Sequence, residues 1–111
     1  MLDTVTKMTE FFKALNDPTR LKVMRILASN PESKLCVGAI ARKLGVTQPA
    51  VSQHLKVLKN VGFVTPNREG YRVHYSVNPE TLMDFREGVE ELCQLALNPE
   101  SCDEGCHNHA E

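Results

Sequence analysis

Apolar residues recur at every third or fourth position as far as Phe63, a spacing that places them on one face of an α-helix. The pattern predicts four helices in this part of the chain, over residues 4–15, 18–29, 37–44 and 48–61. Their predicted inner faces are Val5, Met8, Phe12 and Leu15; Leu21, Met24, Leu27 and Ala28; Val37, Ile40, Ala41 and Leu44; and Val51, Leu55 and Leu58. Asp17 and Pro18, a capping residue followed by a proline, mark the start of the second helix.

The third and fourth predicted helices are separated by a short turn. Gly45 suits the left-handed conformation that ends a helix, and the hydroxyl of Thr47 can cap the next one. Two short helices joined in this way predict a helix-turn-helix, whose second helix presents its outer face to the major groove of DNA. That outer face carries amides, a hydroxyl and one cation, which suit base edges and phosphates. Its residues are Gln48, Ser52, Gln53 and Lys56. Helix hairpins also occur with a purely structural role, so the motif alone leaves both interpretations open.

After Gly62 the pattern changes to the alternation of β-strands. Residues 63–68 and 71–77 favour strands, and Glu69 with Gly70 predicts the turn between them. The hairpin carries Arg68 and Arg72 near its tip, where they can reach the DNA backbone. With the preceding helices, the hairpin predicts a winged helix-turn-helix, a mainly α fold of five helices with a two-stranded wing.

The fifth helix is predicted to run from Pro79 to about Leu97, with Asn78 as its cap. At 1.5 Å per residue it is about 28 Å long, and one small domain can hardly cover its apolar face. The first helix is equally amphipathic, so the two helices together predict a two-fold dimer interface. The predicted interface residues are Val5, Met8, Phe12, Phe85, Val89 and Leu92. The chain then divides into a DNA-binding and dimerisation domain, residues 1–97, and a flexible tail rich in cysteine and histidine, residues 98–111.

Length and charge limit the classes of protein to which this chain can belong. The 111 residues suffice for about one domain, which excludes a multidomain enzyme. The net charge of −1 conceals a segregation, because residues 1–78 carry +7 and residues 79–111 carry −8. A basic N-terminal part and an acidic C-terminal part are typical of a protein that binds a polyanion with one face. A solvated charge pattern without a partner is the simpler alternative.

Cysteine usage and hydropathy predict a cellular compartment. The chain shows no secretory leader and no run of about 18 apolar residues, so neither a membrane span nor a disulfide scaffold is expected. We therefore expect a protein of the reducing cytoplasm.

Two stretches together indicate a family. Residues 14–27 read ALNDPTRLKVMRIL, residues 46–64 read VTQPAVSQHLKVLKNVGFV, and a glycine-tipped wing follows. This combination resembles the ArsR/SmtB family of bacterial and archaeal transcriptional repressors, over about residues 8–97. The resemblance implies a winged-helix homodimer that binds double-stranded operator DNA and is released when a metal ion, metalloid or other small signal binds.

The resemblance also implies which positions meet DNA. Those matching Gln48, Pro49, Ser52 and Gln53 face the major groove, and Pro49 is left out because it lacks a side-chain donor. Thr47 joins the predicted DNA-binding set with its hydroxyl at the start of the helix. His54 joins it too, since orienting or phosphate contact is expected of a histidine on this helix more than metal binding.

Two sensor sites of the resembling family are incomplete in this chain. The metalloid site has a Cys-Val-Cys sequence at the start of the third helix, where this chain reads Cys36, Val37, Gly38. The lone Cys36 is more commonly a small buried hydrophobe than a ligand. The metal site on the last helix uses Asp or His pairs, and no histidine lies between Pro79 and Glu100.

The C-terminal segment offers another metal site. Its donors are Cys93, Cys102, Cys106, His107 and His109. Thiolates with imidazoles at this spacing suit thiophilic ions such as As(III), Sb(III), Cd(II) or Zn(II). Because Cys93 lies beside the predicted interface, such an ion would fasten the tail to it and alter the separation of the recognition helices.

Two alternatives remain open at this point. A disulfide among the same cysteines would make the chain a thiol redox switch, or sulfur-responsive repressor, of the same fold. The other alternative, from a different class of function, is a winged-helix protein-interaction module with a structural zinc in its tail. An enzyme is not expected, because the sequence shows no nucleophile with base and orienter, no phosphate loop and no site for a small organic substrate.

Overall fold

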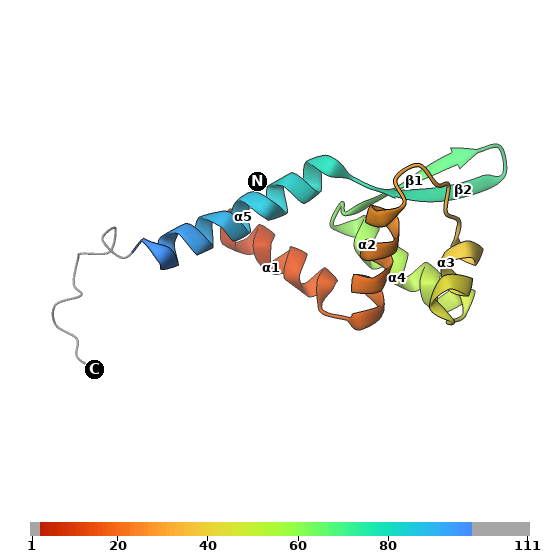
Figure 1. Ribbon diagram of the computed structural model, residues 1–111, viewed down its shortest axis with the longest axis horizontal. Coiled ribbons are helices and arrows are strands. Elements are labelled where there is room, and N and C mark those ends of the chain that lie inside the picture. The colour runs from red at the N-terminus through yellow and green to blue at the C-terminus, as the bar shows by residue number, and fades with distance from the viewer. Residues whose placement is uncertain (1–2, 99–111) are drawn as a thin grey trace.

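The computed structural model describes residues 3–98, which form five helices and one antiparallel pair of strands (Figure 1). The elements are α1 (Thr4–Leu15), α2 (Pro18–Ser29), α3 (Val37–Leu44), α4 (Gln48–Asn60), β1 (Val64–Glu69), β2 (Arg72–Val77) and α5 (Pro79–Leu97). The predicted mainly α fold with a two-stranded wing is confirmed.

Capping residues explain why the helices begin and end where the sequence predicts. The Asp17 carboxylate accepts a hydrogen bond from the backbone N–H of Thr19 at 2.8 Å, and the Thr47 hydroxyl accepts one from Ala50 at 3.3 Å. Gly45 ends α3 with a φ of 69°, in the left-handed region that favours glycine. The helix-turn-helix formed by α3 and α4 is therefore set by local signals.

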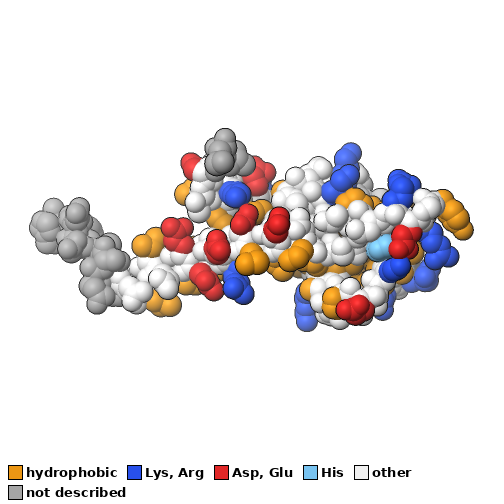
Figure 2. Space-filling view, turned by 90° about the horizontal axis from the view of Figure 1, so that it is seen from above, with side chains coloured by type: hydrophobic (Ala, Val, Ile, Leu, Met, Phe, Trp, Pro, Cys, Tyr) orange, Lys and Arg blue, Asp and Glu red, His pale blue; other side chains and the backbone are white. Residues whose placement is uncertain are grey.

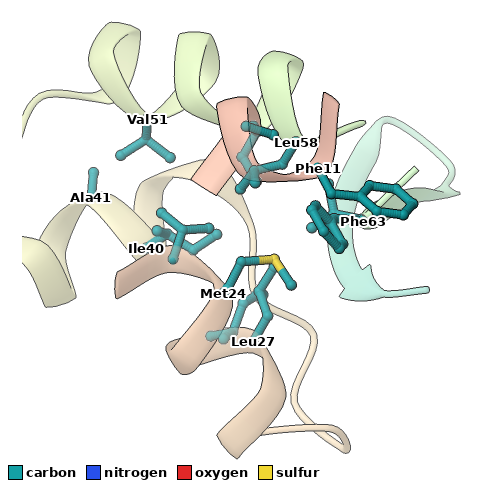
Figure 3. Packing of buried hydrophobic residues seen from close by; sticks show 13 residues of the cluster. Phe11, Met24, Leu27, Ile40, Ala41, Val51, Leu58 and Phe63 are labelled. Carbon is teal, nitrogen blue, oxygen red and sulfur yellow. The ribbon is translucent and has the colours of Figure 1, made fainter. Parts of the chain in front are cut away.

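One hydrophobic core lies between the first four helices and the base of the wing (Figure 3). The α4 face is the predicted one, with Val51, Leu55 and Leu58 fully buried. The ring of Phe63 is buried between α4 and β1, 5.1 Å from the ring of Phe11 between centroids. This core holds α4 against the rest of the domain.

The predicted inner faces of α1 and α2 are confirmed in part, since Met8 and Leu15 pack against the core and Met24 and Leu27 are buried, but the other predicted residues are not. Phe11 and Ala14 are the buried residues of α1, whereas Val5 and Phe12 are exposed. In α2, Val23 joins Met24 and Leu27 in the core, while Leu21 and Ala28 are exposed. Both helices carry apolar residues around much of their circumference, so their own pattern does not determine which side meets the core.

The turn of the wing lies one residue later than predicted. Glu69 pairs with Arg72, which leaves Gly70 and Tyr71 as a two-residue turn. Tyr71, predicted to lie in a strand, is instead the 91% exposed tip, and Phe63 precedes β1 as part of the core. Both arginines of the predicted tip remain beside the turn.

The helices α1 and α5 lie side by side, and α5 continues past α1, away from the rest of the domain (Figure 1). They approach closely at Gly88, where Met8 leaves no room for a β-carbon. No residue of α5 is buried. Large apolar side chains are exposed along the two helices: Val5, Phe12, Leu82, Met83, Leu92, Leu95 and Leu97. Within residues 3–98 no helix is long and apolar enough to cross a membrane.

Candidate nucleic-acid interface

The outer side of α4 presents a row of polar side chains to solvent. Thr47, Gln48, Ser52, Gln53 and Lys56 are all exposed, as the sequence predicts. Gln53 and Lys56 point away from the three residues that α4 buries, while Thr47 and Gln48 are exposed at the start of the helix, so the core holds the helix and leaves this row free. The row offers amide donors and acceptors for base edges and a cation for a phosphate.

His54 differs from the other predicted residues of α4. Its side chain is only 21% exposed, and its two ring nitrogens lie near other side chains of this domain. Nδ1 lies 3.3 Å from Nη1 of Arg20, and Nε2 lies 4.0 Å from a carboxylate oxygen of Asp17. The structure therefore places the ring between α2 and α4, away from the exposed row.

The wing carries exposed cations beside its turn. Arg68 and Arg72 flank the turn on opposite strands, and both are exposed. Contacts between β1 and α4 place the hairpin beside the recognition helix. Cations in this position can reach the sugar-phosphate backbone and strengthen binding without reading much sequence.

A residue that sequence analysis missed connects the wing to the segment before α3. Lys34 forms a 2.8 Å ion pair with Glu69, and a hydrogen bond from Lys34 holds the pKa of the Glu69 carboxyl below its usual range. Its neighbour Leu35 forms a β-bridge with Tyr75. Lys34 lies in a polar loop with no helix or strand signal, so only the fold shows that it contacts the wing.

Most basic side chains lie on a different part of the surface from most acidic ones. Figure 2 shows most lysines and arginines around the end of the molecule that carries the wing, with a few acidic side chains among them, and most aspartates and glutamates along the opposite arm. The acidic group lies on α5 and includes Asp84, Glu87 and Glu91. The segregation of charge seen in the sequence is therefore also a segregation in space, which favours one orientation toward a polyanion.

The predicted description of Cys36 as a buried hydrophobe was wrong, because Cys36 is exposed. It precedes the first turn of α3, and the backbone N–H groups of Ala39 and Gly38 lower the pKa of its thiol, with a smaller contribution from Arg42. Backbone N–H groups at the start of a helix favour the thiolate in this way. Its neighbours explain the exposure, since Leu35 and Ile40 take the core positions on either side.

Only one predicted metal ligand lies within residues 3–98. This residue, Cys93, is exposed on α5. The others lie outside the described residues: Cys102, Cys106, His107 and His109. Among the residues that the structure describes, no three His, Cys, Asp or Glu side chains are grouped so as to hold a metal ion.

Known proteins are similar to this chain in sequence and in fold. Residues 17–65 match the arsR family of bacterial regulatory proteins. The chain is 38% identical to the transcriptional repressor SmtB homolog of Synechocystis over 82% of this chain and 67% of that protein. It is 35% identical to the arsenic resistance transcriptional regulator ArsR2 of Pseudomonas putida, over 83% of this chain and 75% of that protein. The chain belongs to the ArsR family.

The structure agrees with this ArsR-family assignment. A homodimeric winged helix-turn-helix DNA-binding domain from Mycobacterium bovis has a TM-score of 0.64 and 26% identity, over 96% of this chain and 89% of that one. The family match spans α2, α3 and α4 and ends in β1. Proteins of the ArsR family are transcriptional regulators rather than enzymes, which agrees with the prediction that this chain has no catalytic site.

Proposed function

We propose that this ArsR-family chain is a dimeric repressor that reads operator DNA with α4. The observation that carries the proposal is the exposed polar row of α4, held by a buried face and placed beside a basic wing. The predicted DNA-binding side chains of α4 other than His54 lie in this row, and Arg68 with Arg72 extends it along the wing. Localisation in the cytoplasm, where the DNA is, remains part of this proposal.

The dimer is supported by the exposed apolar surface of α1 and α5. Val5, Phe12 and Leu92 of the predicted interface are exposed, whereas Met8, Phe85 and Val89 are half-buried. Phe85 packs edge-on against Phe12, with ring centroids 5.6 Å apart, so the exposed and half-buried residues are continuous. A second copy related by a two-fold axis would cover this surface and place two copies of α4 on successive half-sites.

Replacing Gln53 by alanine is expected to remove most of the preference for the operator while the dimer persists. Gln53 is exposed in the middle of the row, where its amide can form paired hydrogen bonds with a base, and the loss should lower the specificity ratio by about 5- to 150-fold. Fluorescence anisotropy with the chain's own upstream duplex and a scrambled duplex measures this ratio. Equal preference in the variant and the wild type would contradict a reading role for Gln53.

The matched variant is Lys56→Ala, one helical turn along the same face. Loss of a phosphate contact should weaken binding to both duplexes alike and reduce the slope of log affinity against log salt by about one. A wild type whose affinity does not depend on salt would contradict DNA binding and favour the protein-interaction module with a structural zinc.

We further propose that a thiophilic metal or metalloid ion releases the repressor by binding the C-terminal cysteines. The relatives include a regulator of arsenic resistance and a cadmium resistance regulatory protein from Staphylococcus aureus. The donor set combines Cys93 on α5 with Cys102, Cys106, His107 and His109 of the tail, and thiolates suit As(III), Sb(III), Cd(II) and Zn(II). The exposure of Cys93 on the arm of α5 leaves its thiol accessible to an ion.

A chain with both Cys102 and Cys106 replaced by serine is expected to bind DNA normally and to lose its response. Arsenite, antimonite, Cd(II) and Zn(II), titrated anaerobically under reducing conditions, should weaken wild-type DNA binding and leave the double variant bound. Cys36→Ser is the matched control, because it removes an exposed thiol that is not one of the proposed ligands. A full response in the double variant contradicts the proposed site.

The same titration tests the thiol redox switch. Two exposed thiols, Cys36 and Cys93, favour this second candidate, and the lowered pKa of Cys36 makes its thiolate more available to oxidants. A repressor that ignores metal ions and leaves DNA only on oxidation would be a redox regulator of the same fold.

A further inference from the structure

Arg20, near the start of α2, joins the end of α1 to the middle of α4. Its Nε donates a hydrogen bond to the carbonyl oxygen of Ala14 at 2.5 Å, and its Nη2 donates one to the carbonyl oxygen of Lys13 at 3.4 Å. Its third nitrogen, Nη1, lies 3.3 Å from Nδ1 of His54. All three guanidinium nitrogens are therefore engaged, and one side chain bridges two helices that are distant in the sequence.

The contact with Arg20 determines how the His54 ring is oriented. A guanidinium has only donors, so Nδ1 of His54 must accept, and the proton of the neutral ring then lies on Nε2. Nε2 faces Asp17, whose carboxylate lies 4.0 Å away and is itself fixed by the backbone N–H groups of Thr19 and Arg20. The N–H group of Arg20 lowers the pKa of Asp17 below its usual range most strongly, the N–H group of Thr19 adds to the shift, and the charge of the Arg20 guanidinium contributes less.

We propose that Arg20 and His54 are positioning residues that set the orientation of the recognition helix relative to α1. The inference rests on the proposed function, because it assigns a role within DNA reading. His54 lies between Gln53 and Lys56 in sequence, so a shift of its ring moves the turn that carries the reading residues. Since α1 also forms part of the exposed apolar surface, the bridge links the proposed dimer interface to the row that faces DNA.

A positioning role and a direct phosphate contact by Arg20 predict different salt dependence. Each phosphate neutralised by a cation contributes about 0.9 to the slope of log affinity against log salt on duplex DNA. An arginine that acts only through His54 contributes nothing to this slope. Its removal should lower affinity at every salt concentration by the same factor.

The experiment compares Arg20→Met, His54→Leu and the double variant by fluorescence anisotropy on the upstream duplex, from 50 to 200 mM KCl. Each single variant is expected to bind on the order of tenfold more weakly with an unchanged salt slope. The double variant should bind no more weakly than the weaker single variant, because either change removes the same bridge. His54→Asn, which keeps an acceptor near the place of Nδ1, should recover most of the affinity.

The matched control is Arg25→Met, which removes an exposed cation from the same helix. Within residues 3–98 the Arg25 side chain has no hydrogen bond or ion pair, so any loss of affinity in this variant should come with a smaller salt slope. Circular dichroism and sedimentation show whether each variant is folded and dimeric. If Arg20→Met fails to fold, the comparison of His54→Leu with His54→Asn tests the positioning role by itself.

A salt slope that falls by about one in Arg20→Met would make Arg20 a phosphate ligand and overturn the proposal. Additive losses in the double variant, unchanged affinity, or a failure of His54→Asn to recover binding would overturn it as well. A wild type that binds no duplex at low salt overturns the proposed function itself. Failure of the positioning role and failure of the proposed function therefore give different results.

Discussion

Replacing both Leu92 and Leu95 by glutamate is expected to yield a folded monomer that binds operator DNA more than about 100-fold more weakly than the wild type. The two side chains are 61% and 60% exposed in the single chain, so the change removes little from its own core. In the proposed dimer they belong to the covered surface, where an unpaired charge is strongly unfavourable. A monomer has one α4 and binds one half-site, so it loses the additional affinity that results when two linked recognition helices bind two half-sites at once.

Sedimentation velocity measures the monomer directly, and anisotropy on the upstream duplex measures the loss of affinity. The matched control is Gln94→Glu, which adds a charge two residues after Leu92 and hence on nearly the opposite side of the helix. This control should remain dimeric. A Leu92 and Leu95 double variant that sediments and binds as the wild type would show that this surface is not the dimer interface.

Replacing Phe63 by alanine is expected to destabilise the domain by about 3–5 kcal/mol. Phe63 is fully buried, and its ring contacts Phe11 at 5.1 Å and Phe85 at 5.6 Å between centroids. It therefore joins α1, α5 and the end of α4, and no neighbour can fill the space of an aromatic ring without moving a helix. Because domains of this size are stable by about 5–15 kcal/mol, the loss is a large part of the total.

Thermal and urea unfolding followed by circular dichroism measure the effect, which should exceed about 12 °C in midpoint temperature. Tyr71→Ala is the aromatic control, since Tyr71 is 91% exposed at the wing tip and should change stability by less than about 0.5 kcal/mol. A Phe63→Ala variant that melts within 2 or 3 °C of the wild type, about the shift of 0.5 kcal/mol, would contradict the role assigned to the aromatic cluster.

The local elements of the DNA-binding half follow from short-range signals. The caps Asp17 and Thr47 and the left-handed Gly45 each act within a few residues, so the helices begin and end as predicted. The face of α4 was also predictable, because its three buried residues, Val51, Leu55 and Leu58, follow one another at steps of four and three. The exposed row of α4, which we propose reads DNA, was therefore predictable from the hydrophobic and polar pattern of the sequence alone.

The faces of α1 and α2 could not be predicted in the same way. Phe11 and Phe12 are adjacent and equally apolar, yet the first is 4% exposed and the second 49%. Phe85 of α5 contacts both rings, whereas Phe63, which lies between α4 and β1 in the sequence, contacts Phe11, so the position of Phe11 in the core depends on a residue distant in the sequence. His54 was assigned to the DNA surface for a related reason, since its partners Arg20 and Asp17 lie more than thirty residues away.

The sequence by itself determined the family, the order of the elements, the helix-turn-helix and the polar row of α4, because each depends on residues that are neighbours along the chain. Tertiary structure alone decided which side of α1 is buried, how Lys34 holds the wing and where Arg20 and His54 meet. These depend on contacts between segments that are distant in the sequence, and a pattern read along one segment carries no information about its partner.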